Sequence, residues 1–385
     1  MFRFLLLISM LLLFALYAGA ETVTPAVPKP DPTATTQAEK ELGKKTADEI
    51  EKNSKMVKDD ATVERLNAMA AIIVPFTERP GVVYNCKIIE AGDPNAMSIP
   101  GGTIYFTTGL LKAVESDDEL AGVLAHEMAH NSLGHVQQML KSEARGKLAW
   151  LLATIASVFV RDSGGEIPPV AAISTMSSLV VQSLNNGYQE DMEMEADLHA
   201  VDYIYKSGKY DPLGIYSVMM GFQQMEQKRA SADPGYLQTH PQSNIRLVTI
   251  EKRLKELGIT MNLWRVLGFH AEAVPPKGDE KGYGLQMGVV SVVTFTVPML
   301  PQTPEMRAAS AVLAINTTLK QQYIQQFDVA STLLGGKAYI TFGRKAVMVL
   351  TTEDAIAAGI PLAEMAEKTT NNIKNAIWQE IIKHS

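Results

Sequence analysis

The chain has 385 residues, of which 46% are hydrophobic and 20% charged, and its formal net charge is -7. This composition is typical of a globular protein with a sizeable core, and the length is sufficient for two domains. An acidic chain without a Lys/Arg block offers no basic face to phosphates, so we expect no nucleic-acid partner.

The first 20 residues have the pattern of an export signal. One positive charge, Arg3, precedes an apolar run from Leu5 to Tyr17, and Ala18-Gly19-Ala20 provides a cleavage site of small residues. We therefore expect residues 1–20 to be a cleaved signal peptide. The alternative is an uncleaved anchor, but the apolar run is shorter than the roughly 20 residues that a spanning helix needs.

The next segments predict a tether, scaffold helices and a strand. Residues 21–37 are rich in Pro and Thr, which indicates a flexible linker. Between Ala38 and Pro75, apolar residues recur at helical spacing. Residues 82–90 predict a strand that contains the single cysteine, Cys86. One thiol cannot form an internal disulfide, and we expect a buried structural cysteine rather than a nucleophile, because nothing nearby in the sequence would lower its pKa.

A strand-like segment from Ala96 to Thr107 follows the turn Gly92-Asp93-Pro94-Asn95 and contains Pro100-Gly101-Gly102. Proline lacks a backbone donor and glycine favours a bend, so this segment does not fit the centre of a regular sheet. We predict an edge strand beside the helix that comes next. Such an edge could bind an extended peptide by strand addition, and the alternative is a structural bulge.

The pentapeptide His126-Glu127-Met128-Ala129-His130 has the pattern H-E-x-x-H. A capping box from Ser116 to Glu119 and apolar residues at helical spacing predict that it lies on a helix. Residues four apart share one helix face, so both imidazoles can bind one zinc ion while Glu127 points into the same cleft. The pattern can also occur by chance on a surface helix, and further ligands are needed to decide.

A catalytic zinc ion usually has three protein ligands and a fourth position for water. The extended pattern that supplies a third histidine requires Gly at position 133 and His at position 136, but the chain has Leu133 and Val136 there. His135 lies one residue before the position that the pattern requires. On a continuing helix it would lie opposite His126, so we interpret it as a packing or supporting residue rather than a ligand.

A second acidic cluster, residues 190–197, begins an amphipathic helix downstream. On a helix Glu193 and Asp197 share a face, whereas Glu195 points away. We therefore predict Glu193 as the third ligand and Asp197 as acceptor for the free N–H of a zinc histidine. In a zinc hydrolase of this kind, Glu127 takes the proton of the attacking water and later passes it to the leaving amine. The alternative is that the cluster only caps and solvates its helix.

Two apolar runs, residues 148–160 and 170–184, lie on either side of a polar link. Each is too short to cross a bilayer comfortably. We predict a helical hairpin that belongs to the core or lies against the active cleft, and apposition of residues 148–184 to a membrane is the alternative.

The C-terminal part has a different pattern. Helices continue to about Leu257, and a break rich in Pro, Gly and charge extends from Ala273 to Gly284. We therefore predict a metallopeptidase domain at residues 38–260 and a small α+β domain of unknown role at residues 285–385. Its predicted strands are residues 289–297, 337–342 and 346–350, before a closing helix.

Six segments form a joint pattern: Asn95-Ala96, Ile99 to Gly102, Gly109 to Leu111, Asp118 to His130 with His135, Glu193 to Asp197, and Thr239-His240-Pro241. Together they resemble the zinc metallopeptidase family that includes the CAAX prenyl protease, HtpX and BepA, over roughly residues 40 to 255. The resemblance implies a gluzincin fold, mainly α with a small edge-strand sheet. It also implies that His126, His130 and Glu193 bind one zinc ion, Glu127 is the base and Asp197 supports the site.

The resemblance also gives a role to His240. In BepA-like members the matching histidine can occupy the fourth zinc position and keep the enzyme latent. We expect His240 to be either such a latch or a donor to the tetrahedral oxyanion, with Arg246 supporting the same wall. A purely structural role is the alternative.

Two departures from the family refine the expected function. The prenyl protease and HtpX branches have several spanning helices, whereas this chain shows only an export signal, and BepA-like proteins carry helical repeats that this sequence does not show. We therefore expect an exported zinc-dependent metalloendopeptidase, periplasmic or associated with the cell envelope, that cleaves unfolded or misassembled envelope proteins. The alternatives are a latent protease that acts mainly as a chaperone or quality-control binding protein, and a metal-bound scaffold without turnover. The intact Glu127 argues against the scaffold, which needs the ligands but not the base.

Overall fold

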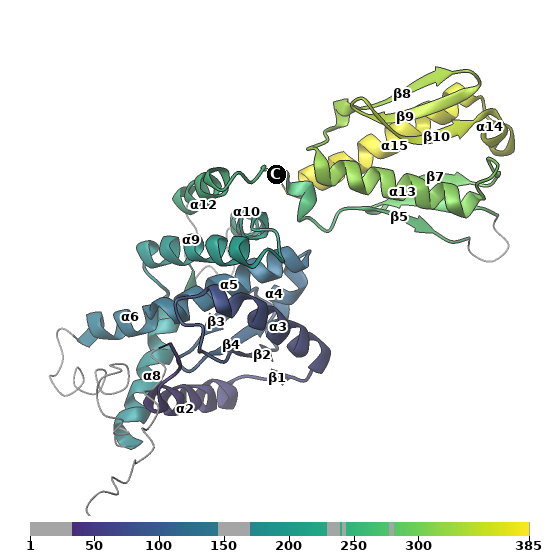
Figure 1. The fold of residues 1–385 in the computed structure, drawn as a ribbon. Coiled ribbons are helices and arrows are strands. Elements are labelled where there is room, and N and C mark those ends of the chain that lie inside the picture. The colour runs from purple at the N-terminus through teal and green to yellow at the C-terminus, as the bar shows by residue number, and fades with distance from the viewer. Residues whose placement is uncertain (1–32, 145–169, 229–238, 241–243, 277–280, 385) are drawn as a thin grey trace, which may run out of the picture.

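The structure, a computed structural model, describes residues 33–144, 170–228, 239–240, 244–276 and 281–384 (Figure 1). The predicted signal peptide, most of the predicted linker and the apolar run 148–160 lie outside these residues. The described chain forms a mainly helical part with one sheet, followed by a part that contains two further sheets.

Two capped helices begin the helical part. α2 (Gln37–Asn53) and α3 (Asp60–Ile73) start after Thr36 and Asp59, whose side chains accept hydrogen bonds from backbone N–H groups three residues on. The sequence predicted scaffold helices between residues 38 and 75, and the structure confirms them. Between the two helices lies the short strand β1 (Met56–Val57).

The first sheet has the strand order β1-β2-β4-β3. β2 (Asn85–Ile89) runs parallel to β4 (Thr103–Thr107), and β3 (Ala96–Ser98) is antiparallel to β4 at the edge. Cys86 on β2 is fully buried, and burial raises the pKa of its thiol to about 12. The thiol therefore stays protonated at neutral pH, as expected for a structural cysteine.

The Pro-Gly-Gly segment differs from its prediction. Pro100-Gly101-Gly102 does not interrupt an edge strand but turns the chain between β3 and β4. Gly101 and Gly102 have φ angles of 89° and 93°, a region that side chains with a Cβ rarely adopt, and these angles reverse the chain direction. Of the two strands in this segment, only β3 is therefore at a sheet edge, and β4 lies inside the sheet.

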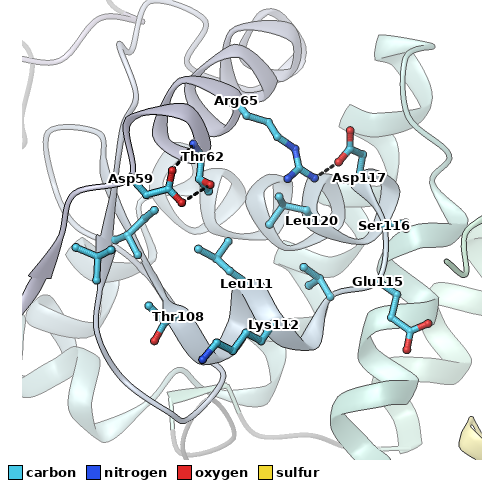
Figure 2. A pocket seen from close by; sticks show the side chains of 13 residues that line it. Asp59, Thr62, Arg65, Thr108, Leu111, Lys112, Glu115, Ser116, Asp117 and Leu120 are labelled. Carbon is cyan, nitrogen blue, oxygen red and sulfur yellow. Dashed lines mark hydrogen bonds and ion pairs between the residues drawn. The ribbon is translucent and has the colours of Figure 1, made fainter. Parts of the chain in front are cut away.

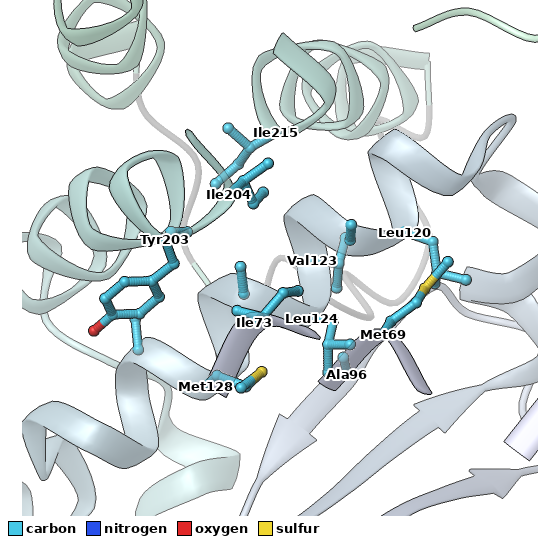
Figure 3. Packing of buried hydrophobic residues seen from close by; sticks show 14 of the residues in the cluster. Met69, Ile73, Ala96, Leu120, Val123, Leu124, Met128, Tyr203, Ile204 and Ile215 are labelled. Carbon is cyan, nitrogen blue, oxygen red and sulfur yellow. The ribbon is translucent and has the colours of Figure 1, made fainter. Parts of the chain in front are cut away.

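The metal-motif helix, α5 (Asp117–Leu133), lies at the centre of the helical part. Ser116 caps its first turn, and the run from Glu119 to Ser132 is buried on every face. Such a helix must be enclosed by its neighbours. Figure 3 shows Val123, Leu124 and Met128 packed between side chains of α3, the sheet and two later helices.

The helices after α5 complete this core. They are α6 (His135–Ala144), α8 (Val170–Asn186), α9 (Glu190–Ser207), α10 (Leu213–Lys228) and α12 (Asn244–Glu256), while α4 (Thr108–Ala113) precedes α5. α9 and α10 pack against α5, and α12 packs against α9. α8 packs against α2 and buries Ile173, Met176 and Val180, so this half of the predicted hairpin belongs to a core. Among the described helices, none combines the length and apolar character required to cross a membrane.

The C-terminal part contains two antiparallel three-stranded sheets with the strand orders β5-β6-β7 and β10-β9-β8. Helices α13 and α15 each pack against strands of both sheets. In chain order the elements are β5 (Ala271–Val274), β6 (Tyr283–Met287), β7 (Val290–Phe295), α13 (Pro304–Gln321), β8 (Val329–Leu334), β9 (Lys337–Phe342), β10 (Lys345–Thr351), α14 (Thr352–Ala358) and α15 (Leu362–Lys383).

The boundary of this part lies earlier than the predicted residue 285. The C-terminal core already includes Trp264, Phe269 and Ala271. The segment predicted as an interdomain break lies between β5 and β6, which pair with each other. A Pro- and Gly-rich hairpin connection and a linker have the same composition, so composition alone misplaced the boundary. The predicted strands correspond to β7, β9 and β10, whereas the prediction missed β5, β6, α13, β8 and α14.

Candidate metal centre

α5 brings the two histidines and the glutamate of the pentapeptide into one buried site. The Nε2 atoms of His126 and His130 face each other at 3.0 Å. Both imidazoles and the Glu127 carboxylate are buried. Two ring nitrogens with facing lone pairs repel each other unless a proton or a cation lies between them, so this arrangement favours a metal ion.

α9 supplies the third donor predicted from the sequence. Glu193 Oε1 lies 3.3 Å from His130 Nε2, and Oε2 lies 3.4 Å from His126 Nε2. Its carboxylate therefore reaches both histidines from the facing helix. α9 is the principal packing partner of α5. This packing brings Glu193 to His130 and His126, which lie 63 and 67 positions earlier in the chain.

The donor spacing fits a zinc ion. Zinc–nitrogen bonds of about 2.0–2.1 Å give a ligand tetrahedron with edges of about 3.3–3.5 Å. The Nε2 atoms of His126 and His130 lie 3.0 Å apart, and each lies 3.3 or 3.4 Å from one of the two carboxylate oxygens of Glu193. Two imidazoles and a carboxylate also form a donor set that zinc accepts. The residues present thus fit the metal that the motif predicts.

His240 provides a fourth donor at the same point. Its Nδ1 lies 2.9 Å from Glu193 Oε1 and 3.3 Å from His126 Nε2, while its Nε2 lies 3.3 Å from Glu127 Oε1. The ligand atoms of His126, His130, Glu193 and His240 all lie within 4.8 Å of one another. His240 is therefore inside the site, between the metal donors and the predicted base.

A buried arginine holds the two carboxylates of α9. Arg246 on α12 donates through Nε and Nη2 to both oxygens of Asp197, at 2.7 and 2.8 Å, and its Nη1 lies 2.7 Å from Glu193 Oε2. Asp197 Oδ1 lies 2.9 Å from His126 Nδ1. This contact fixes the tautomer that leaves Nε2 of His126 free to bind a metal. The sequence predicted Arg246 as a supporting residue of the wall beside His240, and the structure shows that it pairs with these two carboxylates.

His135 supports the second histidine. Its Nδ1 lies 2.8 Å from Nδ1 of His130, and its Nε2 lies 3.3 Å from Oε2 of Glu195. The prediction assumed a continuing helix, but α5 ends at Gly134, whose φ of 73° redirects the chain and brings His135 back to His130. Glu195, predicted to point away from the site, supports it through His135.

Tyr188 is a site residue that the sequence analysis missed. Its ring stacks on the His130 imidazole, with centroids 3.7 Å apart and planes 18° apart. The side chain is buried, and its hydroxyl has no hydrogen-bond partner in the described part of the chain. Its only sequence signal was an aromatic residue directly before the ligand helix, five positions ahead of Glu193.

The pKa values of the candidate ligand Glu193 and of the candidate base Glu127 are shifted in opposite directions. Burial alone would raise the pKa of Glu193, but the charges of His240 and Arg246 hold it well below its usual range. Burial raises the pKa of Glu127, and the nearby histidines only partly offset that effect. One carboxylate therefore stays ionised to bind a cation, while the other is poised to accept and release a proton.

A separate cavity of about 390 Å³ lies at the opposite end of α5 (Figure 2). Leu111 and Leu120 form part of its apolar lining, and Asp59, Arg65 and Asp117 lie around it. It contains none of the metal donors. The candidate chemistry therefore lies at the buried cluster and not at this cavity.

Comparison with known proteins agrees with the site. The model of peptidase family M48 matches residues 58–254. The chain is 24% identical to the putative beta-barrel assembly-enhancing protease of Vibrio cholerae over 207 residues, 54% of this chain and 42% of that protein. It is 28% identical to the metalloprotease LoiP of Escherichia coli over 179 residues, 46% of this chain and 66% of LoiP. It is 27% identical to the metalloprotease YcaL of the same species over 177 residues, 45% and 63% of the two chains.

The chain spans 42–66% of the lengths of these relatives. The family model matches the helical part of the chain. The matched range contains the pentapeptide, the acidic cluster of α9, His240 and Arg246. It begins just before α3 and ends within α12, and thus leaves out the C-terminal sheets. The family match extends over half of the chain, and the donors converge as a metallopeptidase requires: the chain belongs to peptidase family M48 and is a metallopeptidase.

Proposed function

We propose that this metallopeptidase is a zinc-dependent endopeptidase of the gluzincin type, with His126, His130 and Glu193 as ligands and Glu127 as base. The observation that carries the proposal is the convergence of three donors, at spacings close to the edges of a zinc tetrahedron, beside the buried carboxylate of Glu127. Zinc bound there would acidify the attacking water and polarise the scissile carbonyl.

The chain's own groups account for the proton transfers. Glu127 accepts the proton of the attacking water at its carboxylate and later donates it to the leaving amine. Its raised pKa brings proton uptake closer to neutral pH than an exposed glutamate would allow. Asp197 and Arg246 keep His126 in the tautomer that binds metal through Nε2.

The substrate would be an extended polypeptide lying along β3. This strand is at the sheet edge, packs beside α5 and ends at Ser98, whose backbone is close enough to Glu127 to affect its pKa. Strand addition holds a peptide by main-chain hydrogen bonds and needs little sequence specificity. Unfolded or misassembled proteins of the cell envelope fit this mode. The export pattern of residues 1–20 and the β-barrel assembly named for one relative support a periplasmic setting.

Cleavage of unfolded casein by zinc-loaded protein tests the proposal. Wild-type protein is expected to cleave it, and the Glu127→Gln variant, which keeps the ligands but lacks the base, is expected to be at least about 100-fold slower. Removing zinc with a chelator is expected to abolish cleavage, and added zinc to restore it. Persistent cleavage by Glu127→Gln would show that the mechanism is wrong.

A latent protease that acts mainly as a chaperone is the second candidate, and the position of His240 favours it. An imidazole that lies within 3.3 Å of two metal donors and of the base occupies the space that water and a carbonyl need. Suppression of aggregation of an unfolded client separates the two candidates. Equal suppression by wild type and Glu127→Gln, with no cleavage by either, would favour the binding protein.

A further inference from the structure

β8 is an exposed edge strand in the C-terminal part. β8 is the last strand in the order β10-β9-β8 and pairs only with β9 among the described elements. Figure 1 shows it along the outer side of this part, with α15 behind the sheet. Of its six residues only Val329 is buried, and the other five are exposed.

The hairpin register shows which main-chain groups point outward. Gly335 and Gly336, both with positive φ, form a two-residue turn between the paired residues Leu334 and Lys337. In such a hairpin the hydrogen-bonded pairs alternate along the strands, starting at the turn. Val329, Ser331 and Leu333 therefore direct their N–H and C=O groups away from β9. The N–H of Val329 already donates to the carbonyl of Gln326 in the turn before the strand, so the outward donors of β8 are those of Ser331 and Leu333.

The other edges of the two C-terminal sheets carry hydrogen bonds from side chains of neighbouring helices. On β5, the Asn316 side chain accepts a hydrogen bond from the N–H of Ala271 at 2.7 Å and donates one to its carbonyl at 2.8 Å. On β7, Asn372 donates to the carbonyl of Val292 at 3.1 Å. On β10, Arg307 donates to the carbonyl of Val349 at 3.2 Å.

Among the described residues, β8 receives no such hydrogen bond from a helix. The side-chain hydrogen bond to its backbone, from Thr341 Oγ1 to the carbonyl of Ala330, comes from β9 itself. β8 also lacks the other usual protection of an edge, because the sequence V-A-S-T-L-L contains neither a charge nor proline. Apolar side chains stand at both ends: Phe327 is 78% exposed, and Leu334 is 70% exposed.

We propose that the β8 edge binds an extended, uncharged polypeptide segment, which adds to the sheet as a fourth strand. The outward N–H and C=O groups of Ser331 and Leu333, with the C=O of Val329, offer main-chain hydrogen bonds. Alternate side chains of the guest would lie beside Leu333 on one face and Leu334 on the other. An uncharged edge between apolar side chains favours a β-prone, uncharged guest.

The small size of the edge favours a flexible peptide over a second folded copy of this chain. A six-residue strand is about 20 Å long, and a sheet edge about 10 Å thick, so the contact covers only about 200 Å². A stable complex between folded proteins needs about 800 Å² per partner. A peptide can use the edge alone, and a metallopeptidase meets such segments in unfolded proteins. That source of the guest rests on the proposed function, whereas the binding itself requires no turnover.

Fluorescence titration of the full chain tests the proposal in a Glu127→Gln background, so that no guest is consumed. A Thr332→Cys substitution places an environment-sensitive dye on β8, because the native Cys86 is buried. The probe is an uncharged peptide of about ten residues with alternating valine and threonine. Saturable binding with a change in dye emission is expected, and no binding would overturn the proposal.

Two variants locate the contact. Ser331→Pro removes one outward N–H at an edge position that tolerates proline, and it is expected to weaken binding by about tenfold or more. Leu334→Lys adds an edge charge and is expected to weaken binding by about fivefold or more. Leu313→Lys on α13 is the control, because the Leu313 side chain is also 70% exposed. Its affinity for the peptide is expected to stay within about twofold of the parent protein.

Circular dichroism tests whether each variant is folded. If Ser331→Pro does not fold, the affinity of Leu334→Lys alone tests the proposal. Unchanged affinity in the folded edge variants would overturn the proposal. It would also fail if the peptide did not bind while sedimentation showed a dimer that Ser331→Pro dissociated, because the edge would then join two copies. Absence of casein cleavage by wild type removes the proposed function but leaves this binding result intact.

Discussion

His240 lies where it would control access to the candidate metal centre. Its ring nitrogens lie 2.9 Å from Glu193 and 3.3 Å from Glu127, so it competes with water and substrate for the same space. We expect His240→Ala to increase casein cleavage by about tenfold or more, because a latched population no longer has to open first. The exposed His270→Ala serves as control and should leave the rate unchanged. A loss of cleavage in His240→Ala would instead assign His240 as an oxyanion donor.

Tyr188 stacks on His130, one of the candidate metal ligands. Because its ring stacks on His130 at 3.7 Å, we expect Tyr188→Leu to weaken zinc binding by about tenfold, measured by competition with a chromophoric chelator. Tyr188→Phe keeps the ring and should bind zinc as the wild type does. Equal affinities for all three proteins would show that the stack does not position His130.

The residues of the site divide into those that spacing predicts and those that it does not. His126, His130 and Glu127 follow from a four-residue helical period, and Glu193 with Asp197 follows from the same period on α9. Tyr188 lies outside any period, because its contact with His130 depends on how the chain enters α9.

At the scale of elements, the approach of α5 to α10 depends on a glycine. A Cβ at Gly122 would lie 2.9 Å from the backbone of Ile215, whereas a Cβ at Gly221 on α10 meets nothing within 4 Å. We expect Gly122→Ala to lower the free energy of unfolding by about 1–3 kcal/mol, because the helices must move apart. Gly221→Ala, the control, should raise it by up to about 1 kcal/mol through helix propensity. Calorimetric unfolding measures both, and unchanged stability in Gly122→Ala would contradict close packing at this crossing.

Elements with a local signal were predictable, and elements defined by their partners were not. α5 carries a capping residue, Ser116, and an apolar run, and both determine its start and its burial. β8 has five exposed residues and no alternation of apolar and polar side chains, so its pairing with β9 alone identifies it as a strand. The Pro-Gly-Gly turn was visible as a break, but its role between β3 and β4 depended on pairing.

At the scale of the whole molecule, the last turn of α15 contacts the segment before α5. Glu115 lies 3.4 Å from His384 and also pairs with Lys383, while Glu380 lies 3.1 Å from His384. Burial alone would lower the pKa of His384, but the two glutamates raise it to about 9. Burial alone would raise the pKa of Glu115, but His384 and Lys383 lower it to about 2.

These shifts predict how the contact depends on pH. A raised folded-state pKa means that the stabilising contribution of His384 is complete below its ordinary pKa of 6.5 and disappears as the pH rises through about 9. We therefore expect His384→Ala to lower the midpoint of thermal unfolding at about pH 6 and to have a smaller effect above about pH 9.5. An effect of equal size at both pH values would show that His384 contributes by packing instead of charge.

Local sequence predicts the candidate chemistry of this protein: two histidines and a glutamate at helical spacing, an acidic pair one turn apart, and the family that this pattern resembles. These features are local, because helix geometry converts spacing along the chain directly into a shared face. The fold was needed to show that His240 lies 3.3 Å from Glu127, that Arg246 pairs with Asp197 and that β5 belongs to the C-terminal sheets. It also shows that, among the described strands, β8 pairs only with β9. The physical reason is that packing between distant segments fixes these contacts, and no local period of the chain records it.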